Sequence, residues 1–379
     1  MDDTVVFGAL LFVNQLIVGN LVHRPLRSLI SALAVAIEIM MILSITGLML
    51  GMLNGSRRQT SGSGMDMLVR PGAASALMNT SGASASVKVA DVLATLPHVA
   101  VAAPVNIKLT LGSSLENIYG IDYASYNALR PFVFLAGGPF QHPDDVMVDD
   151  LQAASGKKLH VGDTLKVLNH PFHVCGIFEH GKGARKFIPL ATMDDIDGTP
   201  GKASAFFLRL DDTKYDAIVR REILATPGMQ QYNVQTAEEV LASLTPDHLP
   251  GFNIFMRIVI GIAVVVGFLV IFQSMYTAVM ERTREIGILK SLGASRSLIV
   301  SVVLRESGLL ALAGIALGIL VTYGLRALLH AKFPTTSFEI TREWLALSVL
   351  LTLAGALLGA FYPALKAARK DPIDALSYE

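Results

Sequence analysis

Four long apolar segments alternate with polar stretches along the chain. The first, Ser28 to Ser56, contains one charge, and the others lie at about 257–280, 298–327 and 343–365. Each reaches the roughly 20 residues that a helix needs to cross a bilayer. The pattern therefore predicts four transmembrane helices, at 23–56 with an outer extension, 251–280, 298–327 and 343–365.

Residues 57–250 separate the first two apolar segments and form the only large soluble stretch. Thr60–Gly64 is rich in Ser and Gly, which predicts a linker. Beyond it, short β-like runs alternate with helical patterns, so we expect a mixed α+β domain. The expected strands are Met65–Arg70, Val99–Leu111, Val146–Val148, Leu165–Leu168, Phe172–Phe178 and Ala205–Leu210, with a hairpin turn at Asn169–Pro171. The expected helices are Val87–Leu96, Lys214–Ala225 and Thr236–Leu244.

The segment 1–22 is apolar at its centre, but residues 4–18 are too short to span a membrane. Asp2 and Asp3 stand where a secretory signal carries positive charge, and no small-residue cleavage pattern follows. We therefore expect an interfacial amphipathic helix at 1–22.

The distribution of basic residues predicts the orientation. The loop 281–297 and the two terminal segments, on one side, hold nine Lys and Arg, whereas the short loop 328–342 holds two. Because basic residues concentrate on the cytoplasmic side, we expect cytoplasmic termini, with 366–379 as a cytoplasmic tail. The domain at 57–250 and the short loop 328–342 are then outside.

The composition fits an integral membrane protein. The chain is 52% hydrophobic and 16% charged, with a mean hydropathy of +0.51, whereas soluble domains are about 25% charged. Its net charge of zero argues against a nucleic-acid partner. The single cysteine, Cys175, excludes an intrachain disulfide.

The loop between the second and third apolar segments has the pattern of a short amphipathic helix. Ile286, Leu289 and Leu292 recur at helical spacing and predict an apolar ridge. Two pairs of opposite charge, Glu281/Arg284 and Arg282/Glu285, are three residues apart, where side chains on one helix can meet. Such a helix in water next to the membrane has the shape of a docking element.

The ends of this helix are also predictable. Gly293 is a natural terminator, and Ser295 can cap the amino end of the next helix. An alternative interpretation is a solvated turn whose positive charge only sets the topology.

Two long motifs resemble a known family. The run E-R-T-R-E-I-G-I-L-K-S-L-G-A-S at 281–295, with L-R-E-S at 304–307, closely resembles the coupling region of MacB/FtsX-type ABC transporter permeases, the type VII or mechanotransmission family. Tyr362 to Leu376 resembles the usual ending of that family. Val161–Leu165, Val174–Ile177 and Ile188–Thr192 more loosely resemble its MacB-like periplasmic core domain.

The resemblance implies that a separate cytoplasmic ATPase docks on the 281–297 loop, helped by the C-terminal tail. The implied docking residues are Glu281, Arg282, Arg284, Glu285, Ile286, Gly287, Ile288, Leu289, Lys290, Leu292, Gly293 and Ala294. The implied C-terminal motif residues are Pro363, Arg369, Asp371, Pro372, Ala375 and Leu376. The family also implies pairing with a second permease copy or a paralogue. A periplasmic adaptor or a lipoprotein is a further partner that it allows, and membrane lipid surrounds the spans.

Candidate sites for chemistry are few. The sequence has no G-x-x-x-x-G-K-[ST] phosphate loop, so we expect no enzymatic activity and no cofactor in this chain, with ATP and Mg²⁺ bound by the partner ATPase. His170, His173, Glu179 and His180 are possible metal ligands, but their spacing is not that of a zinc site, and we expect none. Cys175 lies within an expected strand and is interpreted as a small buried residue.

Glu38 is the one carboxylate inside the first span. It can serve a proton-linked role or a contact across a dimer, or it can simply make a hydrogen bond between helices. Gly314/Gly318 and Gly355/Gly359 are small-xxx-small pairs that let helices approach closely.

The sequence as a whole predicts the permease subunit of an ABC transporter in the inner membrane. It would transmit ATP-driven motion to the outer domain, to extract or export a lipophilic, peptide or lipoprotein cargo. One alternative is a signalling or scaffold protein that activates an outer partner, as FtsX does, without transport. Another is a membrane-anchored enzyme, for which no set of catalytic residues is visible.

Overall fold

The computed structural model describes residues 25–72, 84–111, 115–156, 158–245 and 251–370. The chain divides into two compact units. The helical unit comprises Met1–Met49, Ile254–Leu328 and Phe338–Glu379, and the sheet unit comprises Leu50–Asn253 and Leu329–Ser337. The interfacial helix expected at 1–22 lies outside the described residues.

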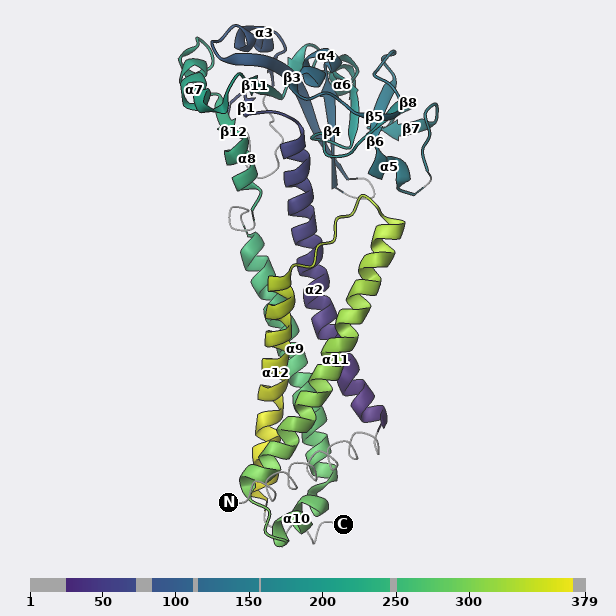
Figure 1. Ribbon diagram of the computed structural model, residues 1–379, viewed down its shortest axis with the longest axis vertical. Coiled ribbons are helices and arrows are strands. Elements are labelled where there is room, and N and C mark those ends of the chain that lie inside the picture. The colour runs from purple at the N-terminus through teal and green to yellow at the C-terminus, as the bar shows by residue number, and fades with distance from the viewer. Residues whose placement is uncertain (1–24, 73–83, 112–114, 157, 246–250, 371–379) are drawn as a thin grey trace. The chain divides into compact units, whose positions relative to one another are not determined.

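Four long helices carry the apolar segments (Figure 1). They are α2 (Pro25–Gly62), α9 (Phe252–Glu281), α11 (Arg296–Lys332) and α12 (Arg342–Arg369). Each is long and apolar enough to cross a membrane, which confirms the expected four-span architecture. A short helix, α10 (Thr283–Ser291), lies in the chain between α9 and α11.

Glycines let these helices pack closely in the helical unit. A Cβ on Gly314 would lie 2.6 Å from the Ala32 carbonyl oxygen, and one on Gly318 would lie 2.1 Å from Ile39 Cγ2, both on α2. A Cβ on Gly359 of α12 would lie 2.8 Å from the Phe268 carbonyl oxygen of α9. These contacts confirm that the small residues of the third and fourth spans serve helix packing.

The end of α2 corrects one prediction. The expected linker at Thr60–Gly64 is helical as far as Gly62. The Ser63 hydroxyl and backbone N–H then both donate to the Thr60 carbonyl oxygen, and Gly64 takes a positive φ of 80°. The helix therefore continues through small residues until Gly64 follows it in the left-handed conformation, which glycine adopts without strain.

The sheet unit is built on a ten-stranded mixed sheet with the order β12-β1-β11-β3-β4-β9-β6-β8-β5, in which β7 also pairs with β8. The strands are β1 (Met67–Arg70), β3 (Val99–Leu111), β4 (Leu115–Ile121), β5 (Phe134–Gly137), β6 (Asp145–Asp149), β7 (Thr164–Val167), β8 (His170–Phe178), β9 (Lys186–Pro189), β11 (Ala205–Leu210) and β12 (Asn233–Thr236). A separate pair joins β2 (Ala85–Ser86) to β10 (Lys202–Ala203). The helices are α3 (Val89–Ala94), α4 (Tyr123–Leu129), α5 (Asp150–Ala154), α6 (Leu190–Asp197), a 3-10 turn η1 (Thr213–Tyr215), α7 (Asp216–Ala225) and α8 (Ala237–Ser243).

Successive side chains of β11 belong alternately to two buried clusters, which gives the sheet a hydrophobic core on each face. Phe206 and Leu208 join one buried cluster with Val219 of α7. Ala205 and Phe207 join another with Tyr126 of α4. Since successive side chains of a strand point to opposite faces, helices cover both faces, and the expected α+β class is confirmed.

The predicted hairpin turn at Asn169–Pro171 is displaced. Val167 pairs directly with His170, so Leu168 and Asn169 form a two-residue turn with φ values of 51° and 65°. His170 and Pro171 are the first residues of β8. Turns with two positive φ values fit the twist of a hairpin. Asn adopts positive φ more readily than most residues, but Leu rarely does, so the sequence does not indicate that Leu168 is part of the turn.

Candidate coupling site on helix α10

Local interactions define both ends of α10. Leu292 is its last capping residue, and Gly293 follows with a φ of 95°. The Gly293 N–H donates to the Lys290 carbonyl and the Ala294 N–H to the Leu289 carbonyl, both at 3.0 Å, which is a complete Schellman motif. The Ser295 hydroxyl then accepts a hydrogen bond from the Leu298 N–H at 3.3 Å. Both boundaries predicted from the sequence are confirmed.

The charge pairs predicted within this loop are replaced by a longer-range one. Arg282 does not pair with Glu285 but donates from Nη1 to Glu306 of α11, 3.2 Å from Oε2 and 3.4 Å from Oε1. The Arg282 and Glu306 side chains are only 11% and 6% exposed. Arg282 lies at the break between α9 and α10, with a φ of −106°, so the spacing rule for a single helix does not apply to it.

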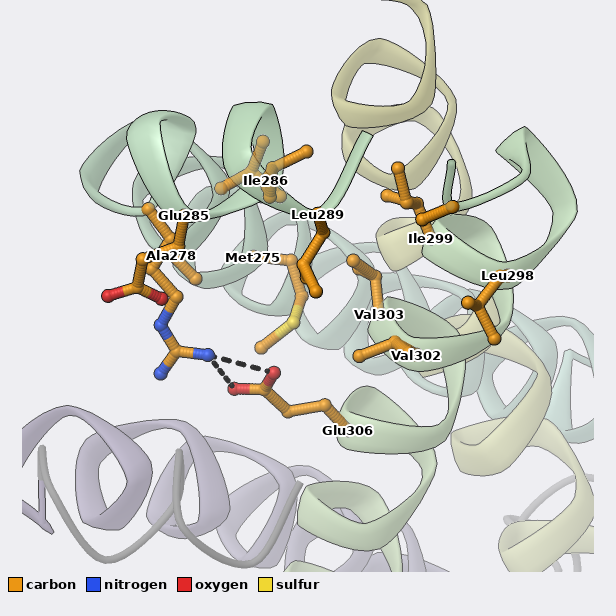
Figure 2. A pocket seen from close by; sticks show the side chains of 13 residues that line it. Met275, Ala278, Glu285, Ile286, Leu289, Leu298, Ile299, Val302, Val303 and Glu306 are labelled. Atoms are coloured by element: carbon orange, nitrogen blue, oxygen red, sulfur yellow. Dashed lines mark hydrogen bonds and ion pairs between the residues drawn. The ribbon is translucent and has the colours of Figure 1, made fainter. Parts of the chain in front are cut away.

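A pocket of about 120 Å³ lies beside this ion pair, between the end of α9, α10 and the start of α11 (Figure 2). Figure 2 shows Met275, Ile286, Leu289 and Val303 around it, with Glu306 at its edge. The pocket is lined by Met275, Ala278, Val279, Arg282, Glu285, Ile286, Leu289, Ala294, Leu298, Ile299, Val302, Val303 and Glu306. Its walls are therefore mostly apolar, with the ion pair and Glu285 as the polar part.

The pocket divides the predicted apolar ridge of α10 into an inner and an outer part. Ile286 and Leu289 line the pocket, and Gly287 is buried. Leu292 is 80% exposed and Ile288 is 44% exposed. The exposed side chains on α10 and at its two ends therefore include Ile288 and Leu292, together with the charges Glu281, Arg284 and Glu285.

The other end of α10 is fastened to α12. The Lys290 ammonium donates to the Ala368 carbonyl oxygen at 3.0 Å and also to the Lys370 carbonyl oxygen. A cation at these carbonyls complements the negative end of the α12 dipole. Helix α10 is thus held at its start to α11 and near its end to α12.

Only part of the predicted C-terminal motif is described. Pro363 is buried within α12, and Arg369 is its exposed last residue. Asp371, Pro372, Ala375 and Leu376 lie outside the described residues.

Glu38 lies inside the helical unit and is 4% exposed. A Cβ on Gly267 of α9 would be 1.8 Å from its Oε2 atom, so this glycine makes room for the carboxyl. Glu38 Oε1 and the Thr352 hydroxyl of α12 are both buried and have no hydrogen-bond partner among the described residues. The carboxyl faces protein, as expected for an ionisable group within a span, and its role stays a hypothesis.

The histidines considered as metal ligands interact with separate carboxylates. His170 Nε2 is 3.0 Å from Asp144 Oδ1, and His180 Nδ1 is 3.0 Å from Asp150 Oδ1. Within the described ranges, no three His, Cys, Asp or Glu residues are grouped as a metal site would require. Cys175 was expected to be buried, but it is only partly buried. Burial still raises the pKa of its thiol to about 12, so the thiol is protonated at neutral pH.

Two family models cover most of the chain. Residues 257–372 match the FtsX-like permease C-terminal model, and residues 28–226 match the MacB-like periplasmic core domain model. The chain is therefore a permease of the ABC transporter class. It belongs to the MacB/FtsX-like family, as the coupling and C-terminal motifs indicated.

Individual relatives agree with this class. An uncharacterised ABC transporter permease of Methanocaldococcus jannaschii is 26% identical over 236 residues, 59% of each chain. The macrolide export ATP-binding/permease protein MacB of Hyphomonas neptunium is 30% identical over 62% of this chain and 37% of its own length. An uncharacterised ABC transporter permease of Bacillus subtilis, YknZ, is 38% identical over 39% of this chain and 37% of its own.

The chain thus spans 59% of the first of these relatives and 37% of the other two. Among solved structures, the periplasmic region of MacB from Actinobacillus actinomycetemcomitans aligns with a TM-score of 0.38 at 15% identity, covering 48% of this chain and 94% of that one.

Proposed function

We propose that this chain passes the motion of a separate cytoplasmic ATPase through its membrane helices to the domain between the first two spans. In this proposal both termini are cytoplasmic, that domain is outside the inner membrane, and ATP and Mg²⁺ are bound by the partner. The work done is the extraction or export of a lipophilic, peptide or lipoprotein cargo. The permease functions as a dimer with a second copy or a paralogue.

The attachment of α10 is the observation that carries the proposal. A docking helix can transmit force only if its displacement moves the spans. Helix α10 is held to α11 by Arg282–Glu306 and to α12 by Lys290, while Ile288 and Leu292 are exposed. A partner that pushes on these exposed residues therefore acts on two spans at once.

Co-purification tests the docking residues. Full-length protein is solubilised from its native membranes in mild detergent, and bound proteins are identified by mass spectrometry. We expect an ABC ATPase with wild type, and a loss of at least ten-fold with Leu292→Asp or Glu285→Lys. Glu343→Lys makes the same charge change at the exposed start of α12 and should retain the ATPase.

The other outcomes are equally informative. An ATPase retained by every variant would move the docking site away from α10. No ATPase with wild type would contradict the proposal and favour an FtsX-like scaffold that activates an outer partner without transport.

A further inference from the structure

A second groove, of about 720 Å³, lies between the start of α11 and the end of α12. Its apolar wall is formed by side chains of both helices, and among the described residues its polar part contains cations and hydroxyls but no carboxylate. The lining residues are Val300, Leu304, Leu357, Leu365 and Ala368, with Arg296, Arg305, Arg369, Ser297 and Ser301. Three arginines around an apolar floor make a site for a molecule that is both anionic and apolar.

The enrichment of basic residues on the cytoplasmic side explains Arg305 less well than the other two arginines of the groove. It follows Arg296 by nine residues along α11, which places it about 13 Å further along the helix. Its side chain is exposed, and it forms no ion pair with any described residue. Glu306, the next residue, is buried and paired with Arg282. A cation at this depth is costly in lipid unless it meets water or an anion.

The three arginines border the groove from two helices. Arg296 and Arg305 are nine residues apart on α11, which places them on opposite edges of the helix face that lines the groove. Arg369 is the last residue of α12 and lines the same groove. Lys366, the nearby lysine of α12, instead donates to the Tyr276 hydroxyl at 2.8 Å. Cations therefore border the groove on both helices.

We propose that this groove binds one anionic phospholipid, with its headgroup at the border formed by Arg296, Arg305 and Arg369 and an acyl chain along Leu304, Leu357 and Leu365. Guanidinium groups bind phosphate through paired hydrogen bonds, and the hydroxyls of Ser297 and Ser301 add donors. Basic pockets between spans at the cytoplasmic side favour anionic headgroups. The leaflet rests on the proposed topology, which makes it the cytoplasmic one.

Two explanations of these arginines make different predictions. In one, their positive charge only sets the orientation of the protein in the membrane; in the other, they form a binding site. If any positive charge on this side were sufficient, Arg284 would matter as much as Arg305. Arg284 is exposed on α10 but does not line the groove. Arg284→Gln and Arg305→Gln therefore remove the same charge from the same side of the membrane, and only the second affects the site.

The test titrates delipidated full-length protein in detergent with dioleoyl-phosphatidylglycerol or dioleoyl-phosphatidylcholine and counts bound lipids by native mass spectrometry. We expect one retained phosphatidylglycerol, preferred at least ten-fold over phosphatidylcholine. Arg305→Gln should weaken its binding by about five-fold, and loss of all three arginines by about a hundred-fold. Arg305→Lys should keep most of the affinity, and Arg284→Gln all of it.

Two results would overturn the proposal: equal effects of Arg284→Gln and Arg305→Gln, or no preference for the anionic lipid. Competition by glycerol 3-phosphate as strong as that by the lipid would also overturn it, because the groove would then bind free phosphate. Helical circular dichroism controls for folding of each variant. No ATPase is present in this assay, so its result is independent of where the ATPase docks.

Discussion

At the scale of single residues, the Arg282–Glu306 pair decides how α10 is held. Glu306 is 6% exposed within an apolar helix, and a buried carboxylate without a partner is strongly destabilising. Arg282 can reach Glu306 because it lies at the interruption between helices α9 and α10. The pair thus satisfies a buried charge and fixes the start of α10 with one interaction.

Replacing one member of the Arg282–Glu306 ion pair should therefore destabilise the protein more than replacing both. We expect Glu306→Gln or Arg282→Gln to destabilise the helical unit by about 3–5 kcal/mol and to speed hydrogen exchange across residues 283–291. The exchanged pair, Arg282→Glu with Glu306→Arg, should recover part of the loss. Glu285→Gln, an exposed carboxylate on the same helix, is the matched control. Equal exchange rates in α10 for all variants would show that the ion pair does not hold it.

Asp149 provides a test of pH dependence in the sheet unit. Its burial raises its pKa from 3.8 to about 6, against the opposing effects of Arg185 and the Gln152 N–H. Between these two values the folded state holds a proton that the unfolded state has released, so stability falls as the pH rises from about 4 to about 6. The effect is at most about 3 kcal/mol.

Asp149→Asn removes this titration and keeps a side-chain oxygen that can cap α5. The difference in unfolding free energy between wild type and Asp149→Asn should therefore change over pH 4–6 and level off above 7. Urea unfolding of the full chain in detergent, followed by hydrogen exchange of β6 peptides, measures it. A slope of opposite sign would mean that the ion pair with Arg185 outweighs burial.

Contacts between residues close together in the chain were predictable from the sequence, whereas contacts between distant residues were not. Gly293 and Ser295 act on backbone groups within five residues, and the sequence predicts both roles correctly. The Arg282–Glu306 pair spans 24 residues and depends on how two helices pack. The only signal of it in the sequence is a Glu next to Arg305 inside an otherwise apolar run, which indicates buried charge but does not identify its partner.

At the scale of elements, the α2–α11 contact depends on two glycines. Gly318→Ala would place a Cβ 2.1 Å from Ile39 Cγ2 and 2.6 Å from the Ala36 carbonyl oxygen. Since the backbone of α2 cannot yield locally, we expect a loss of about 1–3 kcal/mol. Gly324 is on the same helix, and a Cβ there meets nothing within 4 Å. Gly324→Ala should therefore be neutral or stabilise by up to about 1 kcal/mol.

Thermal unfolding of both variants in the same detergent distinguishes these expectations. A lower midpoint for Gly318→Ala alone supports close packing of α2 on α11. If the two variants shift together, the glycines act through helix propensity rather than through the contact.

The strands show what an apolar pattern can predict. Val99–Leu111 and Ala205–Leu210 were expected as strands and coincide with β3 and β11, because both are long or rich in β-branched and aromatic residues. The sequence did not predict β4, which contains Glu116, Asn117 and Gly120, or the four-residue strands β5, β9 and β12. Their conformation comes from pairing with neighbours, which no local pattern specifies.

At the scale of the whole molecule, the four spans were predictable because a bilayer requires long apolar segments. What the sequence could not give are the ties between distant segments. Besides the two that hold α10, a third lies within the sheet unit, where Arg185 Nη2 donates to the Thr335 carbonyl oxygen at 2.9 Å. Thr335 belongs to the loop that follows α11, so within the sheet unit this loop is held by Arg185.

Arg185 also forms an ion pair with the buried Asp149 at 3.1 Å, and this fixes the guanidinium that holds the loop. We therefore expect Arg185→Gln to speed hydrogen exchange in residues 333–337 of the full chain by at least ten-fold. Arg209 provides the matched control, because it also donates to a carbonyl of the sheet unit, that of Ala128 at 2.8 Å. Arg209→Gln should leave exchange in 333–337 unchanged, and an equal effect of both variants would mean that the loop responds to general loosening rather than to loss of this tie. If the ATPase drives the spans as proposed, Arg185→Gln should also lower the rate of cargo extraction or export. ATP hydrolysis by the assembled transporter should remain intact.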